Sequence, residues 1–261
     1  MGNMFDKGML KREWWDLLYA MVEREMRTRY KMAALGFAWI FINPILQMLV
    51  MGFIFQFFVP VKTTNYFEFL FPGLLVWNFF SYTVLKNTPI FINERALLKK
   101  AKFPKEILVL TVVVVNLIHF LLALVVFVAF EWLINSKIHW WRWCLLPAIS
   151  LWLTLLTTGL SFTFSSLNVR WRDTNYGVQA VMPLWFYATP IVYSVDLLPT
   201  WLVNYVHINP MAAIVEILRW AIMGTPVSLL SVGLSIISTL VIFVVGFVIF
   251  KNNSSNFDDW L

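Results

Sequence analysis

The side chains that could carry out chemistry are few in this sequence and lie far apart. The histidines are His119, His139 and His207, and the single cysteine is Cys144. One cysteine allows no disulfide within the chain and no cysteine cluster for a metal. The sequence contains no G-x-x-x-x-G-K-[ST] motif, the loop that cradles the phosphates of ATP. We therefore predict no catalytic residues, no metal site and no cofactor bound by this chain.

One polar pair lies inside a long apolar segment. Asn116 and His119 are three residues apart, so a helix would place them on one face. We interpret His119 as a hydrogen-bonded packing residue and not as a catalyst. The apolar segments hold no acidic pair or lysine that could relay protons, and Glu68 lies near the start of its segment. This pattern argues against a proton-coupled carrier.

Composition and the lengths of the apolar segments indicate a membrane protein. Of 261 residues, 60% are hydrophobic and 13% are charged, and the mean hydropathy is +0.74. A helix needs about 20 apolar residues to cross a hydrocarbon core about 30 Å thick. We predict an all-α membrane protein in which residues 1–261 form a single transmembrane domain, with six spans at 36–59, 66–85, 107–130, 144–167, 176–195 and 227–250. Pro183 and Pro190 interrupt the fifth of these.

The positions of lysine and arginine predict the orientation. Of the 20 lysine and arginine residues, seven precede residue 36 and six lie in residues 86–106. Arg170, Arg172 and Lys251 lie on the same predicted side, whereas the alternate loops hold the other four. Short cytoplasmic loops carry an excess of positive residues. We therefore predict that both termini are cytoplasmic. The charged N-terminal segment also argues against a cleaved signal peptide.

Residues 8–34 are too polar to span a membrane but have the pattern of an amphipathic helix. Apolar residues recur at helical spacing opposite charged ones: Leu10, Trp14, Leu17, Leu18, Met21 and Val22 against Lys11, Arg12, Asp16 and Glu23. We predict an interfacial helix on the cytoplasmic surface that turns into the membrane near Leu35 and Gly36. The helix could form part of a channel entrance or serve only as an anchor.

Two segments between spans have the composition of functional elements. Residues 93–106 (NERALLKKAKFPKE) set Leu97 and Leu98 among basic residues, a pattern that suits docking to a soluble partner, although a solvated basic loop is an alternative. Residues 196–226 are too short to cross twice, and residues 212–223 read as an amphipathic helix. We expect helices that lie on or dip into the outer leaflet, with Glu216 and Arg219 paired at i, i+3. They could cap a pore or form an ordinary structured loop.

The chain holds more aromatic residues than contact with lipid requires. Its 14 Trp, 8 Tyr and 24 Phe make up 18% of the residues. Rings that line a pore would let the apolar faces of sugar rings slide past, whereas lipid contact or packing explains many of them equally well. The candidates for lining a channel are Trp39, Phe53, Phe57, Trp77 and Phe80.

Several motifs in order along the chain resemble one family of transporters. They are RYKMAALGFAWIFINP (29–44), LLKKAKFPKEIL (97–108), NVRWRD (168–173), ATPIVYS (188–194) and NPMAAIVEILR (209–219). The sequence resembles the permease subunits of ATP-binding-cassette polysaccharide exporters, a group that includes the O-antigen (Wzm), capsule (KpsM) and teichoic-acid (TarG) permeases. The resemblance covers nearly the whole chain.

The resemblance implies a homodimer in the bacterial inner membrane, joined to two copies of a cytoplasmic ATPase of the Wzt type that binds ATP and magnesium. Its substrate would be a lipid-linked polysaccharide, with O-antigen favoured, and its other contacts membrane lipids but no nucleic acid. By position, the channel entrance would be Arg29, Tyr30, Leu35 and Gly36. Coupling to the ATPase would involve Glu94, Arg95, Leu97, Leu98, Lys99, Lys100, Phe103 and Pro104. The outer gate would include Pro210, Glu216 and Arg219.

Other functions remain open at this point. Teichoic acid or capsular polysaccharide could be exported by the same mechanism, and a related exporter could carry a small molecule. An integral-membrane enzyme that modifies glycans or lipids would need carboxylates or histidines converging at one membrane face. The sequence shows no such cluster.

Overall fold

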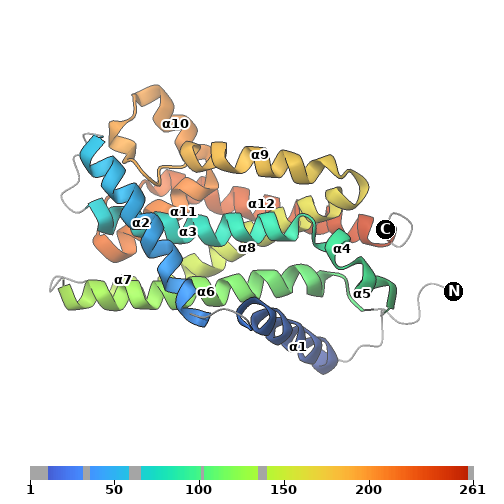
Figure 1. Ribbon diagram of the computed structural model, residues 1–261. Helices are drawn as coiled ribbons and strands as arrows, with labels where there is room; N and C mark the ends of the chain where they lie inside the picture. The colour runs from blue at the N-terminus through green and yellow to red at the C-terminus, as the bar shows by residue number, and fades with distance from the viewer. Residues whose placement is uncertain (1–10, 32–35, 59–65, 101–102, 135–139, 258–261) are drawn as a thin grey trace.

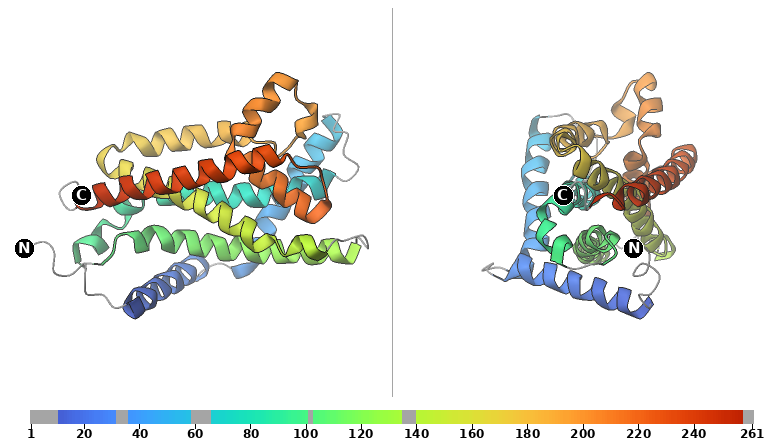
Figure 2. Two further views of the ribbon diagram at one scale, coloured as in Figure 1. Left: turned by 180° about the vertical axis from the view of Figure 1, so that it is seen from behind. Right: turned by 90° about the vertical axis from the view of Figure 1, so that its right-hand side faces the viewer.

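A computed structural model describes residues 11–31, 36–58, 66–100, 103–134 and 140–257. Within these ranges the regular structure is entirely helical, in agreement with the predicted all-α class. The longest helices run side by side as a bundle, and α2 (Trp39–Phe58) crosses one face of it at a steep angle (Figures 1 and 2).

Five described helices are long and apolar enough to cross a membrane, and they coincide with five of the six predicted spans. A short 3-10 turn, η1 (Gly36–Ala38), leads into α2, and the others are α3 (Tyr66–Asn87), α6 (Glu106–Ile134), α8 (Leu146–Arg170) and α12 (Leu229–Ser254). Their mean hydropathies range from 1.2 to 2.9 over the most apolar windows. Continuous apolar runs of spanning length account for this agreement.

The fifth predicted span, 176–195, differs from the structure. Helix α9 (Asp173–Ala188) has 16 residues and is about 24 Å long, less than the hydrocarbon thickness. It stops at Ala188 because Thr189 precedes Pro190, and a residue before proline is driven to the extended conformation that Thr189 shows. The predicted end at residue 195 was therefore too late by seven residues.

The segment after α9 forms η2 (Val195–Leu197), α10 (Thr200–Ile208) and α11 (Pro210–Met223). The pair of Trp201–Ile208 and Pro210–Met223 is bent by 91° and would be a sixth span if the pair is counted as one. Helix α11 packs inside the bundle, with Ile214, Val215 and Leu218 fully buried. That these helices lie on or dip into the outer leaflet stays a prediction.

Helix α1 (Lys11–Tyr30) lies beneath the N-terminal half of α6 (Figure 1). Leu18 and Met21 are buried against Ile107 of α6, so the predicted apolar stripe packs on protein. Trp15 and Tyr19 of the same helix are exposed. The position of α1 at the membrane surface stays a prediction.

The two ends of the bundle carry different elements. The start of α1, the end of α12, α4 (Ile90–Asn93) and α5 (Arg95–Lys100) gather at one end, whereas α7 (Trp140–Trp143) and α10 lie at the other (Figure 1). That both ends of the chain share one side of the membrane stays a prediction, and so does which side that is.

Buried side chains of α3 form the centre of the bundle, and 78% of its most apolar window is buried. Helices α8 and α12 approach each other most closely, at Gly159 and Gly246. A Cβ at Gly159 would lie 2.6 Å from the Cα atom of Phe243, and one at Gly246 would overlap the carbonyl oxygen of Gly159. Only glycine permits this backbone contact between the two helices.

Candidate functional site

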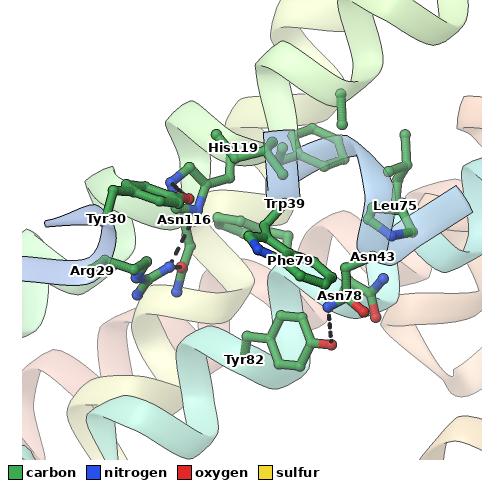
Figure 3. A pocket seen from close by; sticks show the side chains of 14 residues that line it. Arg29, Tyr30, Trp39, Asn43, Leu75, Asn78, Phe79, Tyr82, Asn116 and His119 are labelled. Carbon is green, nitrogen blue, oxygen red and sulfur yellow. Dashed lines mark hydrogen bonds between the residues drawn. The ribbon is translucent and has the colours of Figure 1, made fainter. Parts of the chain in front are cut away.

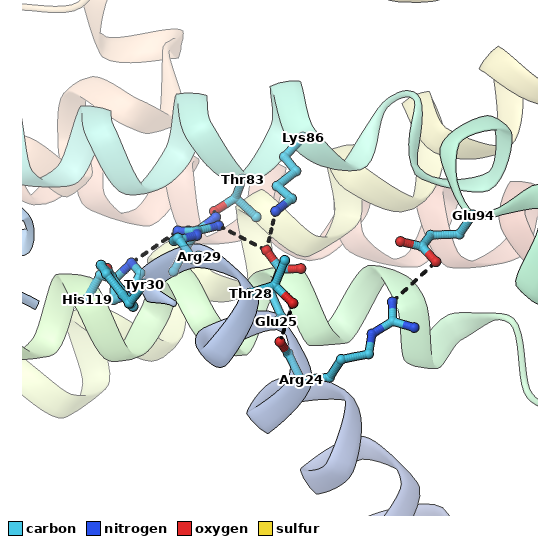
Figure 4. Close-up of polar contacts among 10 residues, drawn as sticks. Arg24, Glu25, Thr28, Arg29, Tyr30, Thr83, Lys86, Glu94 and His119 are labelled. Atoms are coloured by element: carbon cyan, nitrogen blue, oxygen red, sulfur yellow. Dashed lines mark hydrogen bonds and ion pairs between the residues drawn. The ribbon is translucent and has the colours of Figure 1, made fainter. Parts of the chain in front are cut away.

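The last two turns of α1 carry an acidic side chain that joins two cations. The carboxylate of Glu25 accepts a hydrogen bond from Lys86 Nζ of α3, and Arg29 Nη2 donates to it at 3.5 Å (Figure 4). Glu25 and Arg29 are four residues apart on one helix face. This group therefore fastens α1 to α3.

Arg29 also reaches the polar pair of α6. Its Nη1 donates to Asn116 Oδ1 at 2.9 Å and lies 3.2 Å from His119 Nδ1. Asn116 Nδ2 in turn donates to the hydroxyl of Thr83 on α3 at 3.0 Å. The prediction that Asn116 and His119 share a face is confirmed, and so is the interpretation of His119 as a hydrogen-bonded residue.

His119 is held between Arg29 and Tyr30. Its Nε2 lies 2.9 Å from the hydroxyl of Tyr30. A guanidinium can only donate, so Nδ1 of His119 must accept, and the ring proton then sits on Nε2 and is donated to Tyr30. Burial raises the pKa of Tyr30, although the charge of Arg29 opposes the rise, so its phenol stays neutral. His119 thus hydrogen-bonds two neighbouring side chains of α1, Arg29 through Nδ1 and Tyr30 through Nε2.

The charges in this network do not cancel. Burial raises the pKa of Glu25, but the hydrogen bond and charge of Lys86 and the charge of Arg29 outweigh burial, so the net pKa is below its usual value. Glu25 is therefore ionised at neutral pH and supplies one negative charge for the two positive charges of Lys86 and Arg29. One positive charge is left over at this junction.

A cavity of about 290 Å³ opens beside the network, between the end of α1 and α2, α3 and α6 (Figure 3). Amides, hydroxyls and aromatic rings form most of its wall, and Arg29 is the charged residue in it. Asn43 and Gln47 of α2 donate to the hydroxyl of Tyr82 at 3.3 and 3.1 Å, which joins α2 to α3. The residues that give the cavity its polar and aromatic character are Arg29, Tyr30, Trp39, Asn43, Asn78, Tyr82, Asn116 and His119.

The chain enters α2 through a glycine turn. Gly36 has φ of +47°, a left-handed conformation that residues with a Cβ rarely adopt. The predicted turn is therefore present at Gly36. Leu35, the other residue predicted there, lies outside the described residues.

The segment predicted to dock a partner presents a different face from the one expected. Leu97 and Leu98 of α5 are half-buried and pack against apolar clusters that include Phe91 and Ile107, and Phe103 packs there too. The expectation that this leucine pair inserts into a partner is therefore corrected, because the pair already fills a place in its own subunit. The exposed residues of α5 are Arg95, Ala96, Lys99 and Lys100.

Residues on both sides of α5 tie it to other elements. Glu94, directly before α5, accepts a hydrogen bond from Arg24 of α1 at 3.2 Å (Figure 4). Pro104 follows α5 and is partly buried, and Lys105 Nζ donates to the carbonyl oxygen of Ser254 at the end of α12 at 2.8 Å. The α5 segment is thus attached to α1 and to α12.

The five aromatic residues predicted to line a channel fall into two groups. Trp39 and Phe53 are exposed on α2, by 46% and 58%. Trp77 and Phe80 are buried in the bundle, where Trp77 contacts Phe186 and Phe80 contacts Trp185. These two rings are not available to a channel on an outer face of the subunit. Phe57 belongs to α2, and its side chain lies outside the described residues.

Arg219, predicted to pair with Glu216, has other partners. Its guanidinium donates to the carbonyl oxygens of Phe69 at 2.9 Å and of Pro190 and Ile191 at 2.7 Å each, and only 3% of the residue is exposed. Among the described residues no ion pair joins it to Glu216. Arg219 thus connects α11 to α3 and to the segment after α9. Pro210 stands at the start of α11, after the bend at Asn209.

Sequence reasoning missed several residues of the α1 junction. Glu25, Lys86, Asn78 and Tyr82 were not singled out, although they form part of the network and of the cavity wall. The spacing of Glu25 and Arg29 was a usable signal. Their partners on α3 and α6 lie 61 to 90 residues away, and no local pattern identifies them.

Comparison with known proteins connects this arrangement to membrane transport. The ABC-2 type transporter family model matches residues 16–223. An O-antigen export system permease protein, RfbA of Klebsiella pneumoniae, is 30% identical over 250 residues, which are 94% of this chain and 95% of that protein. RfbA of Myxococcus xanthus is 34% identical over 180 residues, 69% of each chain. The capsule polysaccharide export inner-membrane protein CtrC of Neisseria meningitidis is 24% identical over 221 residues, 80% of each chain.

Proposed function

Because the chain belongs to the ABC-2 type transporter family, whose members are transporter subunits and not enzymes, we propose that it forms the membrane channel of a polysaccharide exporter. The observation that carries this proposal is the 30% identity to an O-antigen export permease over 94% of the chain. The proposed substrate is lipid-linked O-antigen. Capsular polysaccharide is a second candidate, favoured by the similarity to CtrC.

Energy for export would come from a separate ATP-binding-cassette ATPase, the partner that the family implies. We propose an assembly of two permeases and two ATPases of the Wzt type, with ATP and magnesium held by the ATPase. The exposed basic face of α5, formed by Arg95, Lys99 and Lys100, supports a docking role for this helix. It lies at the same end of the bundle as the start of α1 and the end of α12 (Figure 1).

The cavity at the end of α1 is the proposed entrance for the lipid-linked substrate. Its surplus positive charge suits an anionic linker between lipid and sugar, and its amides and hydroxyls suit sugar hydroxyls. The exposed rings of Trp39 and Phe53 continue along α2 from this cavity and are the proposed channel wall. The bent segment of α10 and α11 is the proposed outer gate.

The chain is a multi-pass protein of the inner membrane. We propose that both termini are cytoplasmic. The excess of lysine and arginine before residue 36 and in residues 86–106 supports this orientation. The grouping of α1, α5 and the end of α12 at one end of the bundle supports it as well.

Co-purification tests the proposed function. The detergent-solubilised chain would be purified with the ABC ATPase encoded nearest to it, and ATP hydrolysis would be measured with and without lipid-linked glycan. We expect a two-plus-two complex whose hydrolysis rises with glycan, compared with the ATPase alone as control. A chain that purifies without any ATPase and shows no response to glycan would overturn the proposal.

A further inference from the structure

A large open groove runs between the C-terminal half of α6 and the N-terminal half of α8. Its volume is about 790 Å³. Leu117, Leu121 and Val125 recur at every fourth residue on one wall, and Leu124, only 3% exposed, forms part of the floor. Leu151 faces the groove from α8. Val125 and Leu151 are 65% and 61% exposed, so the groove opens to the outside of the subunit.

The two hydroxyl groups in the groove have their donors engaged within α8. The hydroxyls of Ser150 and Thr154 each donate at 2.7 Å to the carbonyl oxygen four residues earlier, Leu146 and Ser150. The remaining wall is hydrocarbon, apart from Trp132 and Trp143. A sugar or a phosphate would therefore lose hydrogen bonds to water and regain few here. The groove suits a long hydrocarbon chain.

Both walls of the groove belong to helices that span the membrane. Protein interiors and the lipid around them are closely packed. A space of this size next to lipid is therefore filled with hydrocarbon chains. From Leu117 to Trp132 the helix rises about 22 Å, which exceeds half of the hydrocarbon thickness of about 30 Å. Trp132 of α6 and Trp143 of α7 stand at one end of the groove, the position that interfacial tryptophans favour.

The groove is separate from the proposed substrate entrance. On α6 the entrance uses Asn116, His119 and Ala123, whereas the groove uses Leu117, Leu121 and Val125 on another face. Helix α1 covers the N-terminal half of α6, and the groove lies along the C-terminal half. We propose that the groove holds one acyl chain of a resident phospholipid, in the leaflet farther from α1 and α5. This inference does not depend on the identity of the exported glycan.

Native mass spectrometry of the full-length chain, purified in mild detergent from phospholipid membranes, tests the proposal. We expect the wild-type chain to retain about one phospholipid. Val125→Trp fills the groove, and Leu121→Asn places an amide in it. Each variant should reduce the retained phospholipid about tenfold, the effect of removing about two methylene groups from contact. Val241→Trp is the matched control, because Val241 is 56% exposed on α12, outside the groove. Each variant would first be checked for an unchanged, monodisperse elution.

Three results would overturn the proposal. Equal phospholipid retention in all variants would place the bound lipid elsewhere. A retained polyprenyl phosphate in place of phospholipid would assign the groove to the substrate. Disulfide-linked dimers of Val125→Cys, in a background with the exposed Cys144 changed to serine, would assign the groove to a second copy of the chain.

Discussion

The guanidinium of Arg24 on α1 lies 3.2 Å from the carboxylate of Glu94, the residue directly before α5. The next residue of α1, Glu25, binds Lys86 and Arg29, and Arg29 reaches the proposed entrance. A short chain of polar contacts therefore links the proposed ATPase-docking helix with the proposed entrance. The link runs through the last two turns of α1.

Reversing the charges of this pair tests the link. Arg24→Glu and Glu94→Arg should each leave thermal stability almost unchanged, since an exposed ion pair contributes about 0–1 kcal/mol. Each should reduce glycan stimulation of ATP hydrolysis, and the double variant should restore it. The measurement is hydrolysis with and without glycan in the reconstituted complex. Single variants that respond to glycan like the wild type would remove the pair from the coupling route.

Arg29 should contribute to stability as well as to the entrance. Arg29→Ala leaves the amide of Asn116 and the ring of His119 without their donor, at a cost of about 1–3 kcal/mol for unsatisfied buried polar groups. Thermal unfolding in detergent would show a lower midpoint. Arg27→Ala is the control, because the side chain of Arg27 is 78% exposed and its ion pair among the described residues is with Glu23 in the same helix. Equal midpoints for the two variants would contradict the assignment.

The lowered pKa of Glu25 predicts a pH dependence with a definite sign. The folded protein stabilises the ionised carboxylate, so this stabilisation is fully present above the usual carboxyl pKa of 4.5 and is lost as the pH falls through the lower pKa of the folded state. The stability difference between wild type and Glu25→Gln should therefore be constant near neutral pH and shrink below about pH 4.5. Denaturation midpoints at a series of pH values measure it. A difference that grew on acidification would contradict the shift.

The two faces of α5 should respond differently to substitution. Lys99→Glu combined with Lys100→Glu should weaken recovery of the ATPase by about tenfold or more while leaving the permease stable, since both side chains are exposed. Leu97→Asp should instead lower the thermal midpoint, because it places a charge in an apolar cluster. Pull-down of the ATPase and thermal unfolding of the permease separate the two effects. Normal recovery with the double variant would remove the basic face from docking.

Phe53 and Phe80 form a matched pair for testing the aromatic residues. Phe80→Ala should destabilise the fold by about 3–5 kcal/mol, since Phe80 is fully buried. Phe53→Ala should leave stability unchanged and slow glycan export, because its ring is 58% exposed on α2. Export in proteoliposomes and thermal unfolding would be measured for both. Unchanged export with Phe53→Ala would assign that ring to lipid contact.

Sequence patterns predicted the spanning helices well because long apolar runs have few alternatives. They could not separate Phe53 from Phe80, since the lipid-facing and core-facing sides of a membrane helix are both apolar and no amphipathic contrast exists. The early end of α9 follows from Pro190, a signal that the sequence contained. The partners of Arg29 and Arg219 depend on how distant segments pack, which local spacing does not reveal.

The backbone contact between Gly159 of α8 and Gly246 of α12 limits how the subunit can change shape. If one helix slid along the other, residues with side chains would replace the two glycines at the contact, where even a Cβ atom has no room. Helices α8 and α12 should therefore keep their separation throughout a transport cycle. A pair of spectroscopic labels on these two helices would report a constant distance, against which displacements of α1 and α2 can be measured.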